Sequence, residues 1–388
     1  MKLKLYINSS STFTALQMFD FVACASDFNT IKIVSWYRTP LASDALKKIN
    51  AVNTLYFSQI SHLSKEYIAR ISNVIDKYNP EDVEVHANIY FSHVESWRLL
   101  SALVKKYSCN KIRLHLYDDG AAGVNERTRL NQLSEKEYLL ESAKNKEDLL
   151  SHVFEVEDPF LPEYSVRWPS LRYYCWHHIV ETTYHILGDK FACYNGVISP
   201  FMEDISPYCQ VFDFGIISPK KMAACLCLLN IDYNQFIDLR KEMLAPDAVV
   251  FTGTGNFQRE YDNGCADRVI NKINSLKDKG VIDKGSRVIF KPHPINHPDN
   301  INRIAKHIGD DVFVVPASIP FEFFIMAGII PNNIIGVFST LMLLVPKENI
   351  KYVIFDAKDH NEAMKNPMLL NLINNNLIEE SKVFGWTD

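Results

Sequence analysis

The chain has 388 residues, of which 47% are hydrophobic, so it is long enough for about two domains with cores of ordinary size. Its formal net charge is -5, from 41 basic and 46 acidic residues, and no long run of one sign occurs. Nucleic-acid binding needs a concentrated basic surface, so this balance excludes nucleic acid as an expected partner.

The first half of the chain alternates predicted strands and helices. The predicted strands are residues 2–7, 30–36, 84–89 and 112–117. Hydroxyl residues at 9–12 followed by an amphipathic run at 15–22 predict a helix directly after the first strand, and residues 95–105 predict another. This strand-helix-strand rhythm is typical of a parallel, doubly wound sheet, so we predict an α/β fold.

Three prolines between 159 and 169 follow a polar helical stretch at 130–156 and mark the best linker candidate. A second α/β series follows, with predicted strands at 249–252, 288–291, 312–315, 333–337 and 352–355. We therefore predict a first domain at 1–165, a second at 166–365, and a C-terminal helical segment at about 366–388 that crosses back to the first domain.

The cysteines and the apolar segments bear on the cellular compartment. The eight cysteines are scattered and form no C-x-x-C pair, which favours free thiols in a reducing compartment. No apolar stretch approaches the ~20 residues that span a bilayer, and the N-terminus as written carries no secretion-signal pattern. We therefore expect a cytoplasmic protein without a transmembrane segment.

An acidic turn of Asp118, Asp119 and Gly120 ends the predicted strand at 112–117. Ligands of open α/β sheets bind beyond the carboxyl ends of the strands, where loops free side chains from the hydrogen-bonded ladder. Neighbouring side chains point apart, so we expect one carboxylate to act and the other to hold the turn. A general base, a magnesium ligand and a plain turn stay open for this motif, although magnesium would need further carboxylates nearby.

A second polar turn, Lys291 to Pro294, follows the predicted strand at 288–291. The prolines on either side of His293 restrict its backbone and aim its imidazole. Either a histidinium or a neutral imidazole there can stabilise a phosphate leaving group, with Lys291 adding charge. An ordinary surface histidine in a turn is the alternative.

Further polar residues follow two other elements of the second half. Ser339 and Thr340 lie where the strand at 333–337 passes into a predicted helix, whose first N–H groups and dipole favour phosphate; a plain N-cap is the alternative. Glu322 lies in the first turn of a predicted helix and can accept hydrogen bonds from a ribose diol. The glycine-rich turn at 253–255 lets a ligand approach the backbone, although it is not a complete dinucleotide fingerprint.

The histidines His177, His178 and His185 lie among aromatic residues on apolar segments. Packing histidines are the expected interpretation, because no set of histidines and cysteines has the spacing of a zinc site. We therefore expect no metal and no other cofactor.

Five ordered motifs resemble those of the bacterial sialyltransferases of glycosyltransferase family 80. They are Tyr-Asp-Asp-Gly at 117–120, Phe-Thr-Gly-Thr at 251–254, Phe-Lys-Pro-His-Pro at 290–294, Pro-Phe-Glu-Phe-Phe-Ile-Met-Ala-Gly-Ile-Ile-Pro at 320–331 and Gly-Val-Phe-Ser-Thr-Leu at 336–341. The likeness is strongest over about 248–357 and is confined to short islands before that. It implies a GT-B architecture, with two Rossmann-like domains and a deep interdomain cleft, a CMP-sialic acid donor and a galactose-terminated acceptor.

The resemblance also implies a role for each matched residue. Asp119 matches the general base that takes the proton from the acceptor hydroxyl, and His293 matches the residue that stabilises the departing CMP phosphate. The implied donor contacts are Gly253, Thr254, Lys291, Glu322, Ser339 and Thr340. The implied acceptor or sugar contacts are Ser11, Asn88, Asp118 and Phe257.

Departures from the family pattern concern mainly the acceptor. Residues 121–126 replace the family's usual serine and Glu-Tyr pair, so we expect acceptor recognition to differ. Phe257 stands where the family tends to have a tryptophan, and a phenyl ring stacks on a sugar with less area. Thr340 replaces a second serine, and Pro292 replaces a glycine and removes one N–H.

We therefore predict an inverting, metal-independent sialyltransferase that joins sialic acid from CMP-Neu5Ac to terminal galactose, in α2,3 linkage with α2,6 as the alternative. The resemblance implies a cytoplasmic enzyme of surface lipooligosaccharide or capsule synthesis that can work at the inner face of the membrane. A transferase of a related CMP-activated 2-keto sugar such as Kdo is the first alternative. A catalytically silent module that binds CMP or glycan is the second.

Overall fold

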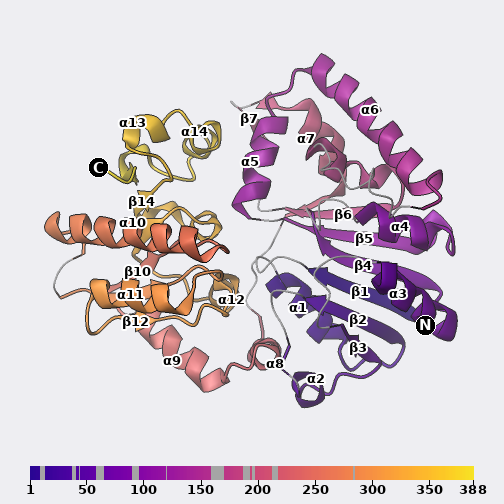
Figure 1. Ribbon diagram of the computed structural model, residues 1–388, viewed down its shortest axis with the longest axis horizontal. Helices are drawn as coiled ribbons and strands as arrows, with labels where there is room; N and C mark the ends of the chain where they lie inside the picture. The colour runs from indigo at the N-terminus through magenta and orange to yellow at the C-terminus, as the bar shows by residue number, and fades with distance from the viewer. Residues whose placement is uncertain are drawn as a thin grey trace. The chain divides into compact units, whose positions relative to one another are not determined.

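The computed structural model describes residues 1–8, 14–36, 41–42, 44–57, 65–89, 96–118, 120–158, 170–186, 193–194, 197–211, 217–282 and 285–388. The chain divides into two compact units. Unit 1 is Met1–Asp213 with Cys227–Asn230, and unit 2 is Phe214–Leu226 with Ile231–Asp388. Each unit is built around one parallel sheet with helices packed on it (Figure 1), so the predicted α/β fold is confirmed.

The sheet of unit 1 has seven strands in the order β3-β2-β1-β4-β5-β6-β9, and all neighbours are parallel. The strands are β1 (Lys2–Asn8), β2 (Thr30–Trp36), β3 (Thr54–Tyr56), β4 (Asp82–Asn88), β5 (Ile112–Tyr117), β6 (Glu181–Ile186) and β9 (Cys209–Val211). The chain starts at β1, runs outward to β3, and then crosses to β4 on the other side of β1. The direction of winding therefore reverses between β1 and β4, which is where open α/β sheets bind ligands.

The two faces of this sheet differ because successive strand residues point to opposite sides. One face is apolar: Leu3, Leu5 and Val85 are buried in a core that includes Ile71 of α3 and Leu100 of α4. The helices of the unit are α1 (Thr14–Cys24), α2 (Ala45–Lys48), α3 (Lys65–Tyr78), α4 (Ser96–Val104), α5 (Ala121–Leu130), α6 (Glu135–Phe154) and α7 (Pro200–Ile205), and a two-stranded ribbon joins β7 (Cys193–Tyr194) to β8 (Val197–Ile198).

The sheet of unit 2 repeats the same winding with six strands in the order β12-β11-β10-β13-β14-β15. The strands are β10 (Ala248–Thr252), β11 (Arg287–Lys291), β12 (Phe313–Val314), β13 (Ile334–Val337), β14 (Ile350–Ile354) and β15 (Val383–Phe384). All neighbours are again parallel, and the reversal lies between β10 and β13. The ligand-binding edge of this unit is therefore the carboxyl end of its three central strands.

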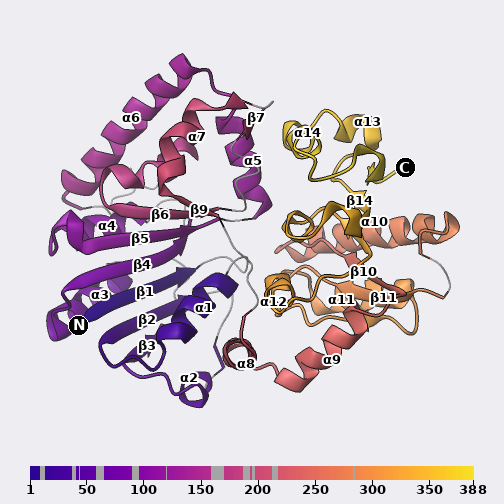
Figure 2. The same cartoon turned by 180° about the vertical axis from the view of Figure 1, so that it is seen from behind.

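Unit 2 also contains helices. They are α9 (Tyr233–Met243), α10 (Arg259–Asp278), α11 (Pro298–Ile308), α12 (Phe321–Met326), α13 (His360–Ala363) and α14 (Pro367–Asn374), together with α8 (Pro219–Leu228), whose last two residues are assigned to unit 1. Figure 2 shows α10 and α11 side by side, and Val269 and Ile273 of α10 pack with Phe251 and Phe290 of the sheet. Within the described part of the chain, no helix combines the length and the apolar character needed to cross a membrane.

The structure corrects the predicted domain boundary at 165. β6 pairs with β5 and β9 pairs with β6, so the chain up to Asp213 extends the sheet of unit 1. At the other end, β15 pairs with β14, and the Nζ of Lys272 donates to the carbonyl oxygen of Gly385 at 2.7 Å. The C-terminal segment therefore belongs to unit 2, where β15 extends the sheet.

Candidate functional site

The carboxyl ends of β10, β11 and β13 lie side by side in unit 2. β10 is the middle strand, and its last residue, Thr252, is paired with Lys291 on one side and with Gly336 on the other. The segments that follow the three strands therefore leave the sheet at the same level. They carry the sequence-predicted residues Gly253, Thr254, His293, Ser339 and Thr340.

Two glycines allow these segments to approach one another. Gly336 has a φ of 121°, and a Cβ there would lie 2.4 Å from the carbonyl oxygen of Thr252. The Thr252 hydroxyl uses this close approach to donate a hydrogen bond to the carbonyl oxygen of Val337 at 2.8 Å. A Cβ on Gly253 would lie 3.0 Å from the ring of Phe290, while its N–H donates to Lys291 at 3.0 Å. Any larger residue at 336 would force the two strand ends apart.

Lys291 and Glu322 are a buried cation and a buried carboxyl at this edge of the sheet. Lys291 ends β11 and donates to the carbonyl oxygen of Pro292 at 2.9 Å, and Glu322 lies in α12. Burial lowers the pKa of Lys291 to about 8, against the opposing charge of Glu322. Burial also raises the pKa of Glu322, although its own backbone hydrogen bond and Lys291 act in the other direction. A polar ligand that binds both groups would restore part of the solvation that each has lost.

His293 is held as a neutral imidazole. Burial lowers its pKa to about 4, helped by the charge of Lys291 and opposed by Asp262. Its N–H donates to the Asn296 side chain at 2.8 Å, and its Nδ1 accepts from the N–H of Ile295 at 3.4 Å. Because Nδ1 accepts, the ring proton is assigned to Nε2. Of the two forms that the sequence left open, the structure therefore favours the neutral donor at neutral pH.

Asp262 is a buried carboxylate that the sequence did not single out. It lies in the first turn of α10 and accepts four hydrogen bonds from neutral donors. Its Oδ1 accepts from the N–H of Asn256 at 3.1 Å and the amide of Asn296 at 2.9 Å, and its Oδ2 accepts from the N–H of His297 at 2.9 Å and the amide of Asn300 at 2.6 Å. Burial alone would raise its pKa, but these hydrogen bonds lower it.

Asn296 connects Asp262 to the loops after β10 and β11, which carry the predicted ligand contacts. Its amide nitrogen donates to the carbonyl oxygen of Thr254 at 2.8 Å, and its oxygen accepts from the N–H of His293. Gly255 is needed beside it, because a Cβ there would lie 2.5 Å from Asn296 Nδ2 and 3.0 Å from Asp262 Oδ1. Asp262 and Asn296 thus tie the loop after β10 to the loop after β11. Asp262 and Asn296 are 34 residues apart in the sequence, so no local pattern predicts their hydrogen bond.

The predicted residues Ser339 and Phe257 of unit 2 are more exposed to solvent than Lys291 and Glu322. Ser339 caps the four-residue 3₁₀ helix Thr340–Leu343, and its hydroxyl accepts from the N–H of Leu341 at 3.3 Å. The sequence predicted a longer helix here. The structure has one short turn instead, so few N–H groups are available to a phosphate. The side chain of Thr340 lies outside the described residues. Phe257 is 61% exposed directly ahead of α10, where its ring can stack on a ligand.

In unit 1, the buried side chain of Asp118 holds the acidic turn in place. Both Asp118 and Arg127 are 0% exposed, and they form an ion pair at 2.6 Å. The N–H of Asp118 donates to the carbonyl oxygen of His185, and a Cβ on Gly123 would lie 1.8 Å from Asp118 Oδ1. Its carboxylate is enclosed by α5, the helix that follows the turn, and the predicted contact of Asp118 with the sugar stays a prediction. The predicted base, Asp119, and Ser11 lie outside the described residues.

Asn88 ends β4 beside Tyr117, the residue that precedes this turn. Its side chain is buried, and its Oδ1 has no hydrogen-bond partner among the residues that the structure describes. Buried polar atoms are almost always paired, so this oxygen has an unmet capacity to accept a hydrogen bond. This fits the predicted contact of Asn88 with a hydroxyl-bearing ligand.

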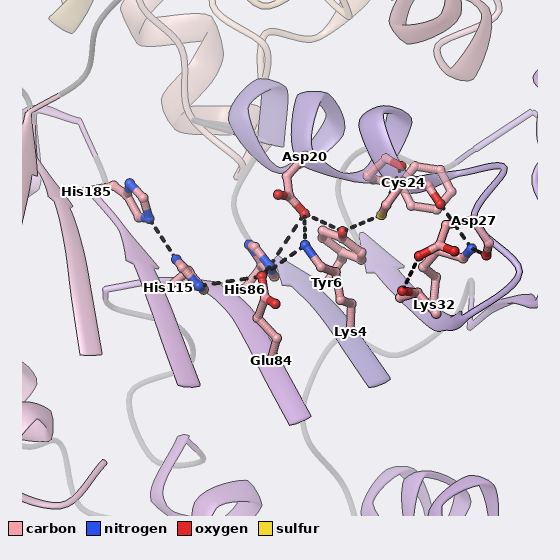
Figure 3. Close-up of polar contacts among 12 residues, drawn as sticks. Lys4, Tyr6, Asp20, Cys24, Asp27, Lys32, Glu84, His86, His115 and His185 are labelled. Atoms are coloured by element: carbon pink, nitrogen blue, oxygen red, sulfur yellow. Dashed lines mark hydrogen bonds and ion pairs between the residues drawn. The ribbon is translucent and has the colours of Figure 1, made fainter. Parts of the chain in front are cut away.

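A polar network covers the second face of the sheet in unit 1 (Figure 3). Lys4 of β1 binds Asp20 of α1 and Glu84 of β4, each at 2.9 Å, and Glu84 also binds His86 Nε2 at 2.9 Å. His86 Nδ1 shares a 2.8 Å hydrogen bond with the hydroxyl of Tyr117. Sequence reasoning missed this network, although alternate polar residues on two strands are a signal that could have found it.

Imidazoles continue the network across the sheet. The rings of His86 and His115 stack with centroids 4.7 Å apart, and His115 shares a 3.1 Å hydrogen bond with His185. Burial, together with the neighbouring imidazoles, lowers the pKa of His115 to about 4 and that of His185 to about 3. The two outer imidazoles, His115 and His185, are therefore neutral at neutral pH.

The chain matches a family model described as Sialyltransferase PMO188 over residues 3–378. No curated protein sequence matches it significantly. Three solved structures share its fold. The α/β-galactoside α-2,3-sialyltransferase of Photobacterium phosphoreum is 19% identical, with 100% of this chain and 99% of that chain covered and a TM-score of 0.78.

The second is a 2,6-sialyltransferase of Photobacterium sp. JT-ISH-224, solved with CMP and lactose. It is 21% identical, with 100% of this chain and 78% of that chain covered and a TM-score of 0.80. The third is the GT-B domain of the Photobacterium damselae sialyltransferase, which is 19% identical, with coverage of 99% and 100% and a TM-score of 0.76. The fold of the chain is therefore GT-B.

Proposed function

Because this chain belongs to the Sialyltransferase PMO188 family, we propose that it transfers sialic acid from CMP-sialic acid to the hydroxyl of a galactoside, with inversion at the anomeric carbon. The chain is a glycosyltransferase by family. The donor, the stereochemistry, the linkage and the residue roles are our proposal. The predicted relationship to bacterial sialyltransferases is confirmed by the family match.

One observation carries the donor side of the proposal. Lys291, His293 and Glu322 belong to neighbouring elements at one edge of unit 2, and each has a pKa shifted by burial. Shifted titratable groups at the carboxyl ends of parallel strands are a ligand-binding signature. A nucleoside monophosphate ester fits them, with the phosphate near Lys291 and His293 and the ribose diol donating to Glu322.

The proposed reaction is a single displacement. The acceptor oxygen attacks the anomeric carbon, the bond from that carbon to the phosphate oxygen breaks, and the hydroxyl proton passes to Asp119. The leaving phosphate gains negative charge, which the Nε2–H of neutral His293 and the ammonium of Lys291 stabilise. An aspartate of ordinary pKa can serve as the base, because the hydroxyl becomes acidic only as the new bond forms.

We further propose that no metal ion takes part in this step. The donor has one phosphate, so its leaving group develops less charge than a diphosphate does. Lys291, His293 and the hydroxyl of Ser339 together offer a cation and two neutral donors. These groups can supply the electrostatic stabilisation that a metal ion would otherwise give the leaving group.

The acceptor is proposed from chemistry and from likeness. The relative solved with lactose makes lactose a suitable first galactoside. Phe257 can stack on the apolar face of a galactose ring, as exposed aromatic residues at sugar sites do. The shared fold accommodates both 2,3 and 2,6 transferases, so the predicted α2,3 linkage depends on contacts to the acceptor rather than on architecture.

The test is transfer from CMP-Neu5Ac to lactose in the presence of EDTA, with CMP-Kdo in a parallel reaction and the product linkage assigned by NMR. Sialyl-lactose as the product supports the donor, the acceptor class and the metal-free step. Transfer from CMP-Kdo alone would replace the sugar in the proposal. Binding of CMP without turnover of either donor, over a panel of galactosides, would contradict catalysis and favour the silent module.

A further inference from the structure

Three potential metal ligands gather in unit 1 and have no part in the proposed transfer. His177 and His178 lie in the 3₁₀ helix Trp176–His178, and Asp204 lies near the end of α7. One ligand atom of each lies within 4.8 Å of the others. No local sequence pattern indicates this set, because the aspartate follows the histidine pair by 26 residues and lies on another element.

The imidazole of His177 has an unused nitrogen. Its side chain is 2% exposed, and its Nε2 is buried without a hydrogen-bond partner among the described residues. Oδ2 of Asp204 lies 3.9 Å from this nitrogen, which is too far for a hydrogen bond. A buried polar atom without a partner is costly and rare, so we expect a ligand that binds to Nε2 of His177.

The surroundings hold the ligands in place. The Nδ1 of His177 shares a 3.2 Å hydrogen bond with the hydroxyl of Tyr184, and the ring of Tyr208 stacks on the imidazole at 4.2 Å. The hydroxyl of Tyr138 donates to Oδ2 of Asp204 at 2.5 Å. Metal-ligating imidazoles and carboxylates are oriented in this way by outer partners.

A second set of this kind, Glu84, His86 and His115, shows what a satisfied cluster looks like. There the ammonium of Lys4 lies 2.9 Å from Glu84 Oε1, and His86 Nε2 lies 2.9 Å from the same oxygen (Figure 3). Lys4 already supplies the positive charge, so the cluster has no need of an ion. The set around His177 differs because its central nitrogen has no partner.

We propose that His177, His178 and Asp204 bind a divalent cation of the Zn²⁺ class. Two imidazole nitrogens, which are borderline ligands, and one carboxylate oxygen make a set of the type that zinc takes, at about 2.0–2.2 Å each. A tetrahedral ion of that size separates its ligand atoms by roughly 3.3 Å, so a small side-chain movement closes the 3.9 Å gap. Asp204 is 34% exposed, which gives the ion an entry path and water a fourth position.

The site belongs to the scaffold of unit 1. The histidine pair precedes β6, while Asp204 lies in α7, between β6 and β9. An ion there would cross-link the two segments and stabilise the folded state by mass action. This role is independent of the metal-free transfer step, whose donor-binding residues lie in unit 2.

Untagged full-length protein, stripped with a chelator, is titrated with Co²⁺ and followed by its visible ligand-field absorption, with Zn²⁺ competing. We expect one Co²⁺ per chain, displaced by Zn²⁺, and a melting temperature that rises with Zn²⁺. The variants His178→Gln and Asp204→Asn should each weaken binding by at least about tenfold. Their far-UV circular dichroism and their melting temperature in chelator report folding.

Two further variants sharpen the test. Lys146 is exposed on α6 and repels positive charge on both imidazoles, so Lys146→Gln should tighten Co²⁺ binding several-fold. His115→Gln, in the satisfied cluster, should leave Co²⁺ affinity unchanged. The proposal is overturned if millimolar Co²⁺ does not bind, if a thiolate charge-transfer band accompanies binding, or if both ligand variants bind as tightly as the wild type.

Discussion

Two buried aspartates lie near the carboxyl edges of the two sheets, and their charges are balanced in different ways. In unit 1, Asp118 follows β5 and pairs with Arg127, nine residues later in the next helix. In unit 2, Asp262 accepts four hydrogen bonds from neutral donors, and three of them come from the segment after β11. The first arrangement fixes one turn, while the second joins the loops after β10 and β11, which carry predicted ligand contacts. Substitution of Asp118 should therefore lower the stability of the fold, and substitution of Asp262 should weaken ligand binding.

The largest effect is expected at Asp119, the neighbour of Asp118. If Asp119 is the base, Asp119→Asn removes proton transfer and should lower kcat by about 10²–10⁴-fold. The affinity for CMP should stay unchanged, because the base meets the acceptor hydroxyl and not the nucleotide. Initial rates at saturating donor and calorimetric CMP binding measure the two quantities. A variant with wild-type turnover would remove Asp119 from the mechanism.

The next effect tests the ion pair of unit 1. Asp118→Asn leaves the guanidinium of Arg127 buried without its counter-charge, which should lower the free energy of unfolding by about 3–5 kcal/mol. Urea denaturation measures this loss. The double variant Asp118→Asn with Arg127→Met removes the stranded charge and should recover much of the stability. If the double variant is no better than the single one, the loss has another origin.

Asp262→Asn tests the coupling of the two loops in unit 2. The substitution turns one acceptor oxygen into a donor that faces other donors, at a cost of about 1–3 kcal/mol. Because those donors order the loops around Thr254 and His293, the donor Kd should rise by roughly 5–150-fold. Asp267→Asn is the matched control on α10, since that carboxylate is 59% exposed in a surface ion pair. Equal donor affinity in the two variants would confine Asp262 to a structural role.

Acidification compares histidines in the two units. The pKa of His293 in unit 2 is lowered to about 4, as is that of His115 in unit 1. An unfolded chain binds these protons near pH 6.5, so it holds more protons than the folded chain between about pH 6.5 and 4. Stability should therefore be fully present above pH 6.5 and fall as the pH drops through this window.

Thermal melts at several pH values measure this loss, and His293→Gln supplies the comparison. The variant should lose less stability on acidification, because its unfolded chain binds up to about one proton fewer in this window. The histidines of unit 1 with lowered pKa values, His115 and His185 among them, keep the rest of the effect. An identical pH profile in the variant and the wild type would mean that His293 titrates normally.

The sequence predicted the central strands well. Predicted strands at 249–252 and 288–291 correspond to β10 (Ala248–Thr252) and β11 (Arg287–Lys291), because buried parallel strands are short apolar runs. The predicted boundary failed because β6 and β9 are short and carry polar residues, so nothing local indicated that they extend the first sheet.

The candidate site was predictable only where a residue directly follows a strand. Lys291 ends β11 and His293 follows it, and strand order then brings both to the edge that also carries Gly253. Asp262 and Asn296 were not predicted, because their role in holding the loops depends on contacts between segments that are distant in the sequence. The enclosure of Asp118 depends on Gly123 leaving room beside it, which requires coordinates.

The smallest effect is expected at the exposed rim, where Phe257 and Tyr261 offer a direct comparison. Both rings are exposed, by 61% and 63%, and lie four residues apart at the start of α10. If only Phe257 stacks on galactose, Phe257→Ala should raise the acceptor KM by about 2–10-fold, from a stacking energy of about 0.5–1.5 kcal/mol. Phe257→Trp should lower it through a larger ring face, and Tyr261→Ala should change nothing. A rise in donor KM instead would move the ring to the nucleotide side of the site.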